Sequence, residues 1–313
     1  MARILLAGVP RSGTSWTGQA LGTTPGTRYV DEPDGFRDAF AFKVMMEAGE
    51  NARLEPGAVA PDYRSLWAGA FAGGVRAPGA AARFAEWTYH RAGTPARRRA
   101  RRGGDLSPWL KAALRTAAPP VADPEARHVV VKSVQCSLAV EWLALEFGPR
   151  VVVIFRHPMN TIASWREMGF VASEARNPRE HEVIVAVAAE RWGIAPPPAG
   201  APELAHHAFE FGVLTNALAD AAARHPDWVV TRHEDLCVDS AVRLRALAEQ
   251  VGLEWDDAAE RFVRDSNREG SGFAITRVAS EQADRWRERL SADDVETIRA
   301  VLHAFPDAAL ADC

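Results

Sequence analysis

The stretch Gly8–Trp16, GVPRSGTSW, decides the fold of this chain. It follows a short apolar run at 4–7, which is typical of a buried strand. It leads into residues 14–21, whose pattern predicts the first turns of a helix. A glycine loop between a strand and a helix directs backbone N–H groups and the positive helix end toward one point. The sequence therefore predicts a phosphate-binding site at this loop.

The position of the basic residue separates this loop from that of kinases and NTPases. Gly8 and Gly13 have the G-x-x-x-x-G spacing of a nucleotide-binding phosphate loop. Such a loop continues with lysine, but this chain has Thr14, and the cation lies inside the loop as Arg11. The glycine spacing alone is also compatible with a simple tight turn between a strand and a helix.

Composition excludes several classes of protein. The 313 residues are 47% hydrophobic and 25% charged, with a formal net charge of −4, which is typical of a soluble globular protein without a general attraction to nucleic acid. Cys136, Cys237 and Cys313 are scattered, so we expect a reducing compartment and no structural metal. Neither a signal-peptide pattern nor an apolar run approaching 18 residues is present, so we expect a cytoplasmic protein without a membrane span.

Two β-branched runs, at 128–133 and 151–155, predict buried parallel strands, and helical spacing between them completes a β-α-β unit. Shorter strands are expected at 28–30 and 228–232. Further helices are expected at 159–168, 180–193, 203–223, 240–251 and after a cap at Ser291. The predicted fold class is therefore α/β, with three layers and a central, mostly parallel sheet flanked by helices.

A second anion site is predicted at the end of the strand at 151–155. Arg156 lies at the carboxyl end of that strand, where ligands of open α/β sheets bind, and Ser164 follows on the next helix. A guanidinium and a hydroxyl at this separation could converge on one phosphate. The alternative is a simple ion pair of Arg156 at the strand end.

These motifs resemble those of sulfotransferases that use 3′-phosphoadenosine 5′-phosphosulfate (PAPS), and the chain is identified as a member of that family. The PRSGTSW string is closest to tyrosylprotein-type and bacterial small-molecule sulfotransferases. Similar elements are Lys132-Ser133, RHEDL at 232–236 and the tail at 280–286. The resemblance covers 3–32, 128–166, 228–240 and 275–290, and residues 40–125 carry none of it.

The resemblance implies a P-loop-like sulfotransferase fold, formed by one domain over residues 1–313. It implies PAPS as donor, 3′-phosphoadenosine 5′-phosphate (PAP) as product and no metal. The donor would be bound by Arg11, Ser12, Gly13, Thr14, Ser15, Trp16, Arg156, Ser164 and His233. His233 departs from the family pattern, which usually has tyrosine there, but a histidine ring can also stack and hydrogen-bond.

Catalysis of in-line sulfuryl transfer requires a cation and a base. Arg11 is the expected cation, stabilising charge on the departing phosphate. Glu32, whose distance from Arg11 in sequence resembles that of the family's catalytic glutamate, is the expected base. Asp31 is its competitor, and strand alternation would direct the two side chains to opposite faces if Glu32 continues the strand. Otherwise Glu32 could cap a turn or pair with Arg28.

Residues 40–125 are expected to form a helical insertion that shapes the acceptor pocket. Between Arg76 and Arg115 there are ten Lys and Arg residues against two acids, most densely at 97–102. This run is either a solvated basic helix, an electrostatic funnel for an anionic donor or acceptor, or, least of all, a nucleic-acid site. His90, His206 and His207 could supply acceptor contacts.

The partner expected from these features is a small-molecule acceptor, such as a metabolite, phenol, alcohol or sugar, with no nucleic acid and no membrane. Oligomeric state stays open. Two alternatives to the sulfotransferase remain: a small-molecule kinase or NTPase on a related fold, and a nucleotide-binding or scaffold protein without catalysis.

Overall fold

The computed structural model describes residues 1–74, 79–270, 276 and 283–306. Its central sheet has the strand order β2-β3-β1-β4-β5, and every pairing within it is parallel. The strands are β1 Arg3–Ala7, β2 Thr27–Asp31, β3 His128–Ser133, β4 Arg150–Phe155 and β5 Val229–Arg232. The prediction of an α/β fold with a parallel sheet is confirmed, and the strands lie within two residues of their expected positions.

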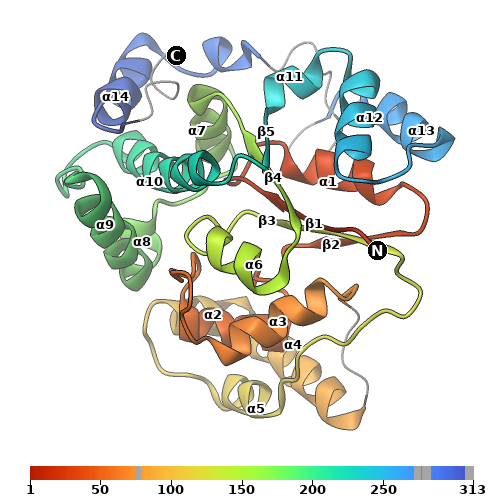
Figure 1. Ribbon diagram of the computed structural model, residues 1–313. Helices are drawn as coiled ribbons and strands as arrows, with labels where there is room; N and C mark the ends of the chain where they lie inside the picture. Colours follow the sequence, from red (N-terminus) through yellow and green to blue (C-terminus); the bar gives the residue numbers. More distant parts are fainter. Residues whose placement is uncertain (75–78, 271–275, 277–282, 307–313) are drawn as a thin grey trace.

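Helices surround this sheet (Figure 1). They are α1 Thr14–Gly22, α2 Ala39–Ala48, α3 Pro61–Ala70, α4 Ala80–Arg101, α5 Pro108–Thr116, α6 Val140–Phe147, α7 Pro158–Glu167, α8 Ser173–Arg176, α9 Pro178–Trp192, α10 Glu203–Arg224, α11 His233–Cys237, α12 Ser240–Gln250, α13 Asp257–Ser266, the 3₁₀ helix η2 Arg285–Glu288 and α14 Ala292–Leu302. The cap of α14 is as expected, because Ser291 and Asp294 form a reciprocal capping box.

Alternation along the strands divides the core into two faces. Ile4 and Leu6 of β1 pack with Val152 of β4 against α1, α12 and α13. Leu5 and Ala7 point the other way, toward α2, α3 and α6. Since both faces are apolar and covered, the strands read as continuous hydrophobic runs, and the chain forms three layers.

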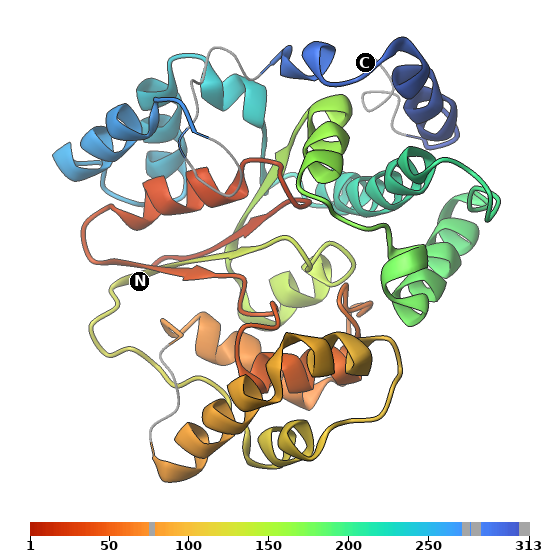
Figure 2. The same ribbon diagram turned by 180° about the vertical axis from the view of Figure 1, so that it is seen from behind.

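The connection from β2 to β3 contains α2, α3, α4 and α5. These helices gather at one end of the molecule, below the sheet in Figures 1 and 2. A third cluster of buried side chains joins them, including Phe42 of α2, Tyr89 of α4 and Leu110 of α5. The segment therefore has an apolar core of its own in addition to its contact with the sheet.

The connections that leave β1 and β4 run in opposite directions along the sheet. The chain passes from β1 through α1 to β2 on one side, and from β4 through α7 toward β5 on the other. A crevice opens at the carboxyl ends of strands where connections diverge in this way, and ligands of open α/β folds bind there. The loop at 8–16 and Arg156 both lie at this crevice.

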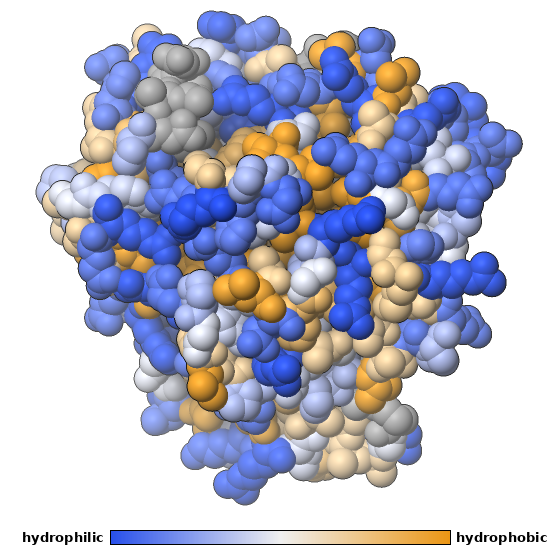
Figure 3. Space-filling view, viewed as in Figure 1, coloured by the Kyte–Doolittle hydropathy of each residue, from blue (hydrophilic) through white to orange (hydrophobic). Residues whose placement is uncertain are grey.

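The face seen in Figure 3 has hydrophilic and apolar side chains interspersed. Within the described part of the chain, no helix has the length and apolar character needed to span a membrane.

Candidate functional site

The loop between β1 and α1 owes its shape to two residues with positive φ. Arg11 has φ 70° and Gly13 has φ 94°. The Ser12 amide donates to Val9 O at 3.2 Å, which closes the turn. The amides at the start of α1, from Thr14 onward, are thereby presented at the mouth of the crevice.

Five of the six loop residues predicted to bind the donor line the cleft: Arg11, Gly13, Thr14, Ser15 and Trp16. Ser12 is the exception. Its side chain is buried behind the loop, against the position that a Cβ on Gly8 would occupy. Because its amide is already bonded to Val9, Ser12 has a structural part in the loop and does not reach the cleft.

His233 packs directly on the loop. A Cβ built on Gly13 would lie 2.2 Å from His233 Nδ1, so only glycine fits beneath the ring. Trp16 meets the same ring edge to face, at 6.0 Å between centroids. The ring is buried, and Nδ1 has no hydrogen-bond partner among the described residues. Burial, and secondarily Arg156, lowers the pKa of His233 well below its usual range, so the ring is neutral and can bond to a ligand.

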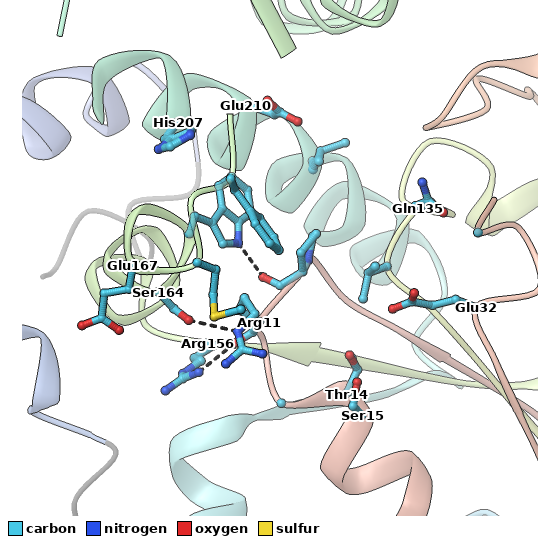
Figure 4. Close-up of a pocket in the computed structure, with 18 of the residues that line it drawn as sticks. Arg11, Thr14, Ser15, Glu32, Gln135, Arg156, Ser164, Glu167, His207 and Glu210 are labelled. Atoms are coloured by element: carbon cyan, nitrogen blue, oxygen red, sulfur yellow. Dashed lines mark hydrogen bonds between the residues drawn. The ribbon is translucent and has the colours of Figure 1, made fainter. Parts of the chain in front are cut away.

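The two predicted phosphate elements touch each other (Figure 4). Arg11 Nε donates to Ser164 Oγ at 3.0 Å, and Arg156 Nη1 donates to the carbonyl oxygen of Arg11 at 2.8 Å. Residues from the ends of β1 and β4 and from α7 thus form one cluster. From the sequence we expected Ser164 to share a phosphate with Arg156, but in the structure its hydroxyl contacts Arg11.

This cluster concentrates positive charge. Burial lowers the pKa of Arg11, and Arg289 lowers it further. Burial also lowers the pKa of Arg156 to about 10, with smaller contributions from Arg11 and Arg289. Arg156 Nε is enclosed and has no hydrogen-bond partner in the described structure. A guanidinium group with an unused donor, next to further positive charge, is suited to binding an anion.

Glu32 lies on the other side of the cleft, just past the end of β2. Its φ is 49°, and its amide donates to Lys132 O at 2.7 Å. The buried Lys132 ammonium contacts the Glu32 carboxylate and lies 3.4 Å from Asp31 Oδ1. Arg37 bridges the same two carboxylates, at 2.7 Å from Asp31 and 3.2 Å from Glu32.

Strand alternation does not separate Asp31 from Glu32. The strand ends at Asp31, and the left-handed turn at Glu32 brings both carboxylates to Lys132 and Arg37. Pairing of Glu32 with Arg28 does not occur either, because Arg28 faces Asp123 at 3.8 Å. The sequence noted Lys132 only as part of a motif, and it gave no signal for Arg37.

One cavity of about 1220 Å³ joins these groups. Figure 4 shows Arg11, Ser164 and Arg156 together near the loop, with Glu32 and Gln135 on one side and His207 and Glu210 of α10 on another. Trp165, which sequence reasoning missed, lines the cavity and fixes the loop by donating to Pro10 O at 2.8 Å. Of the three histidines named as acceptor candidates, only His207 lines the cavity, and neither of its nitrogens has a hydrogen-bond partner among the described residues.

The segments around His157 and the tail close one edge of the site. The amide of His157 donates to Glu234 at 3.1 Å, which joins the RHEDL segment to the end of β4. Asn160 of α7 bonds to Ala283 O and Trp286 N, at 2.8 and 3.0 Å. The tail therefore docks on α7, and Arg285 and Arg289 line the cavity. Residues 280–282 of the predicted tail motif lie outside the described residues.

No protein-family model matches this chain, and no curated protein matches its sequence. In structure, the chain is similar to sulfotransferases. It aligns with the sulfotransferase domain from the curacin biosynthetic pathway at 11% identity and TM-score 0.46, over 96% of this chain and 97% of the other. The sulfotransferase domain from the Synechococcus PCC 7002 olefin synthase gives 13% identity and TM-score 0.46, over 96% and 94%.

Retinol dehydratase, crystallised with androsterone and the inactive cofactor PAP, aligns at 12% identity and TM-score 0.40, over 97% of this chain and 81% of that one. Likenesses of this strength carry no functional argument by themselves. The cleft of this chain brings Arg11, Arg156 and the Glu32 carboxylate into one cavity, with Glu32 paired to Lys132 and Arg37.

Proposed function

We propose that the protein is a PAPS-dependent sulfotransferase that transfers the sulfuryl group to a hydroxyl of a small acceptor. One observation carries this proposal: the bonds from Arg11 to Ser164 and from Arg156 to Arg11. They join two predicted anion-binding elements that lie about 150 residues apart in the chain. Two such elements in contact suit a nucleotide with phosphate groups at both ends.

The side chains of the cleft fit such a donor. The amides at the start of α1 and Arg11 would hold the 5′ end. Arg156, with its unused Nε, would hold the 3′-phosphate. Ser164 Oγ accepts from Arg11, so its hydroxyl hydrogen can donate to a phosphate oxygen. The neutral His233 ring beside Trp16 would contact the nucleoside.

The reaction breaks the bond between sulfur and the bridging oxygen of the 5′-phosphate, and it forms a bond from the acceptor oxygen to sulfur. Glu32 would take the proton of the acceptor hydroxyl. Arg11 would stabilise the charge that develops on the departing phosphate oxygen. Lys132 and Arg37 would orient Glu32, because each contacts one of its carboxylate oxygens.

Titration calorimetry with PAP and with ATP–Mg²⁺ tests the nucleotide. We expect PAP to bind at least about tenfold more tightly, since a 3′-phosphate would contact Arg156 through charge-assisted hydrogen bonds. Arg156→Gln should remove that preference. Arg64→Gln, which removes an exposed arginine of α3, should leave it intact. Tighter binding of ATP–Mg²⁺ would favour the kinase alternative.

A screen of hydroxyl compounds with isotopically labelled PAPS tests the reaction. The product should gain the mass of the sulfuryl group, and PAP should appear in equal amount. PAP binding without transfer to any acceptor would favour the second alternative, a nucleotide-binding protein without catalysis.

A further inference from the structure

The arginines at the carboxyl end of α4 differ sharply in their surroundings. Arg97 lies over the Tyr89 ring at 4.6 Å, and Arg99 faces Asp105 at 3.7 Å, both away from the cavity. Arg98, Arg101 and Arg102 line the cavity that contains Arg11 and Glu32. The basic run of the sequence is therefore split between solvent and the cleft.

The three cleft arginines are not equally engaged. Arg101 donates twice to Glu50, with Nε at 2.8 Å and Nη2 at 2.5 Å, so its charge is already balanced. Arg102 donates Nε to the carbonyl oxygen of Arg176 at 3.3 Å. The Arg98 side chain is exposed and forms no hydrogen bond or ion pair with another described residue. The charges of Arg98 and Arg102 are thus available to a ligand.

A chain of contacts connects these arginines to the proposed base. Arg37 binds Glu32, and the neighbouring Phe36 ring lies 4.3 Å from the Arg101 guanidinium. Arg98 and Arg102 flank Arg101 on the same helix end. These contacts place Arg98 and Arg102 in the part of the cavity wall that adjoins Arg37 and Glu32, where the proposed acceptor would bind.

We infer that the acceptor is a small hydroxyl compound that carries an anionic group, a carboxylate or a phosphate, which Arg98 and Arg102 bind. This inference rests on the proposed function. The cavity volume of about 1220 Å³ exceeds the roughly 300–1,000 Å³ of a typical pocket for one small ligand, so it has room for a donor and a small acceptor together. Glu32 would face the hydroxyl end of the acceptor, and Arg98 and Arg102 its charged end.

Matched pairs of compounds test the charge. We would titrate the PAP-loaded protein with 4-hydroxybenzoate and 4-hydroxybenzamide, and with glucose 6-phosphate and glucose. At least one anionic member should bind about tenfold or more tightly than its neutral partner, since a charge-assisted bond has this strength. The first pair tests for recognition of a carboxylate, and the second pair tests for recognition of a phosphate.

Two variants locate the effect. Arg98→Gln with Arg102→Gln should abolish the preference for the anion. Arg99→Gln, which removes an equal charge from the same helix outside the cleft, should retain it. Both side chains of the double variant are exposed, so its melting temperature should stay close to that of the wild type. Equal binding of both members of each pair to the wild type, or a preference that survives the double variant, overturns the inference.

The experiment separates this inference from the function on which it rests. If the protein binds PAP but shows no preference for anionic acceptors, the inference of an anionic acceptor is refuted and the proposed donor is retained. Failure to bind PAP, together with an anion preference that depends on Arg98 and Arg102 in the empty protein, refutes the donor and retains the anion site.

Discussion

Replacement of Gly13 by alanine tests how the loop and His233 fit together. The new Cβ would lie 2.2 Å from His233 Nδ1 and 2.8 Å from two carbons of the ring. The ring has little room to retreat, because Trp16 lies edge-on at 6.0 Å and Cys237 Sγ lies 3.6 Å from Nε2. The φ of 94° is unfavourable for alanine as well.

Two effects contribute to the expected loss of stability. A left-handed backbone costs roughly 1–2 kcal/mol for a residue with a Cβ. Overpacking of a buried contact costs typically about 1–3 kcal/mol. Gly13→Ala should therefore lower the free energy of unfolding by roughly 2–5 kcal/mol, a large part of the stability of an ordinary domain.

A double-mutant cycle with His233→Ala separates the two effects. Urea unfolding of the wild type, both single variants and the double variant gives the four free energies. Without the ring, only the backbone cost of the alanine should remain in the loop, so the double variant should be about 1–3 kcal/mol more stable than the sum of the singles predicts. Additive losses, within about 0.5 kcal/mol, would refute the packing of His233 on the loop.

Two further predictions concern carboxyl groups. Glu32→Gln keeps the shape of the side chain and removes the base, so turnover of an acceptor found in the screen should fall roughly 10²–10⁴-fold while PAP affinity stays within about threefold; unchanged turnover would remove Glu32 from this role. Burial raises the pKa of Asp34 to about 7 from an ordinary value of 3.8, although a hydrogen bond from Ser133 opposes the shift. The protonated carboxyl thus stabilises the fold fully below pH 3.8, and this contribution is lost as the pH rises toward 7. Between these values the free energy of unfolding of the wild type should fall relative to that of Asp34→Asn, measured by urea unfolding at each pH; parallel profiles of the two proteins would contradict the buried position of Asp34.

Local spacing explains why the positions of most residues of the proposed donor site could be predicted from sequence. Gly8, Arg11 and Gly13 lie in one loop, and Arg156 and Ser164 lie on consecutive elements, so the strand-loop-helix pattern alone places them at one sheet edge. The hydrogen bond between Arg11 and Ser164 could not be predicted from sequence, because the two residues lie 153 positions apart. It also missed the inward turn of Ser12, which follows from the loop's own hydrogen bond.

The positions of the residues on the proposed acceptor side depend on backbone geometry, which the periodicity of the sequence does not predict. Strand alternation does not apply to Glu32, because the strand ends at Asp31 and Glu32 has a positive φ. The helical periodicity of α4 does not predict which way the Arg98 side chain points, because the helix is kinked at Gly93, two residues before Pro95. The contacts of Lys132 and Arg37 with Glu32 require strand pairing and a turn at the same time. Such placements follow from tertiary structure.

The crowding of Arg11, Arg156 and Arg289 has a consequence for the lifetime of the protein. Their mutual repulsion is present whenever the crevice is empty, and Glu167, 3.0 Å from Arg289, offsets only part of it. An anion that enters relieves this repulsion in the folded state and has no equivalent site in the unfolded chain. The nucleotide would therefore protect the protein against unfolding in proportion to the logarithm of its concentration above Kd. Abundance of this protein in a cell would then follow the supply of the nucleotide that the proposed function requires, with no change in synthesis.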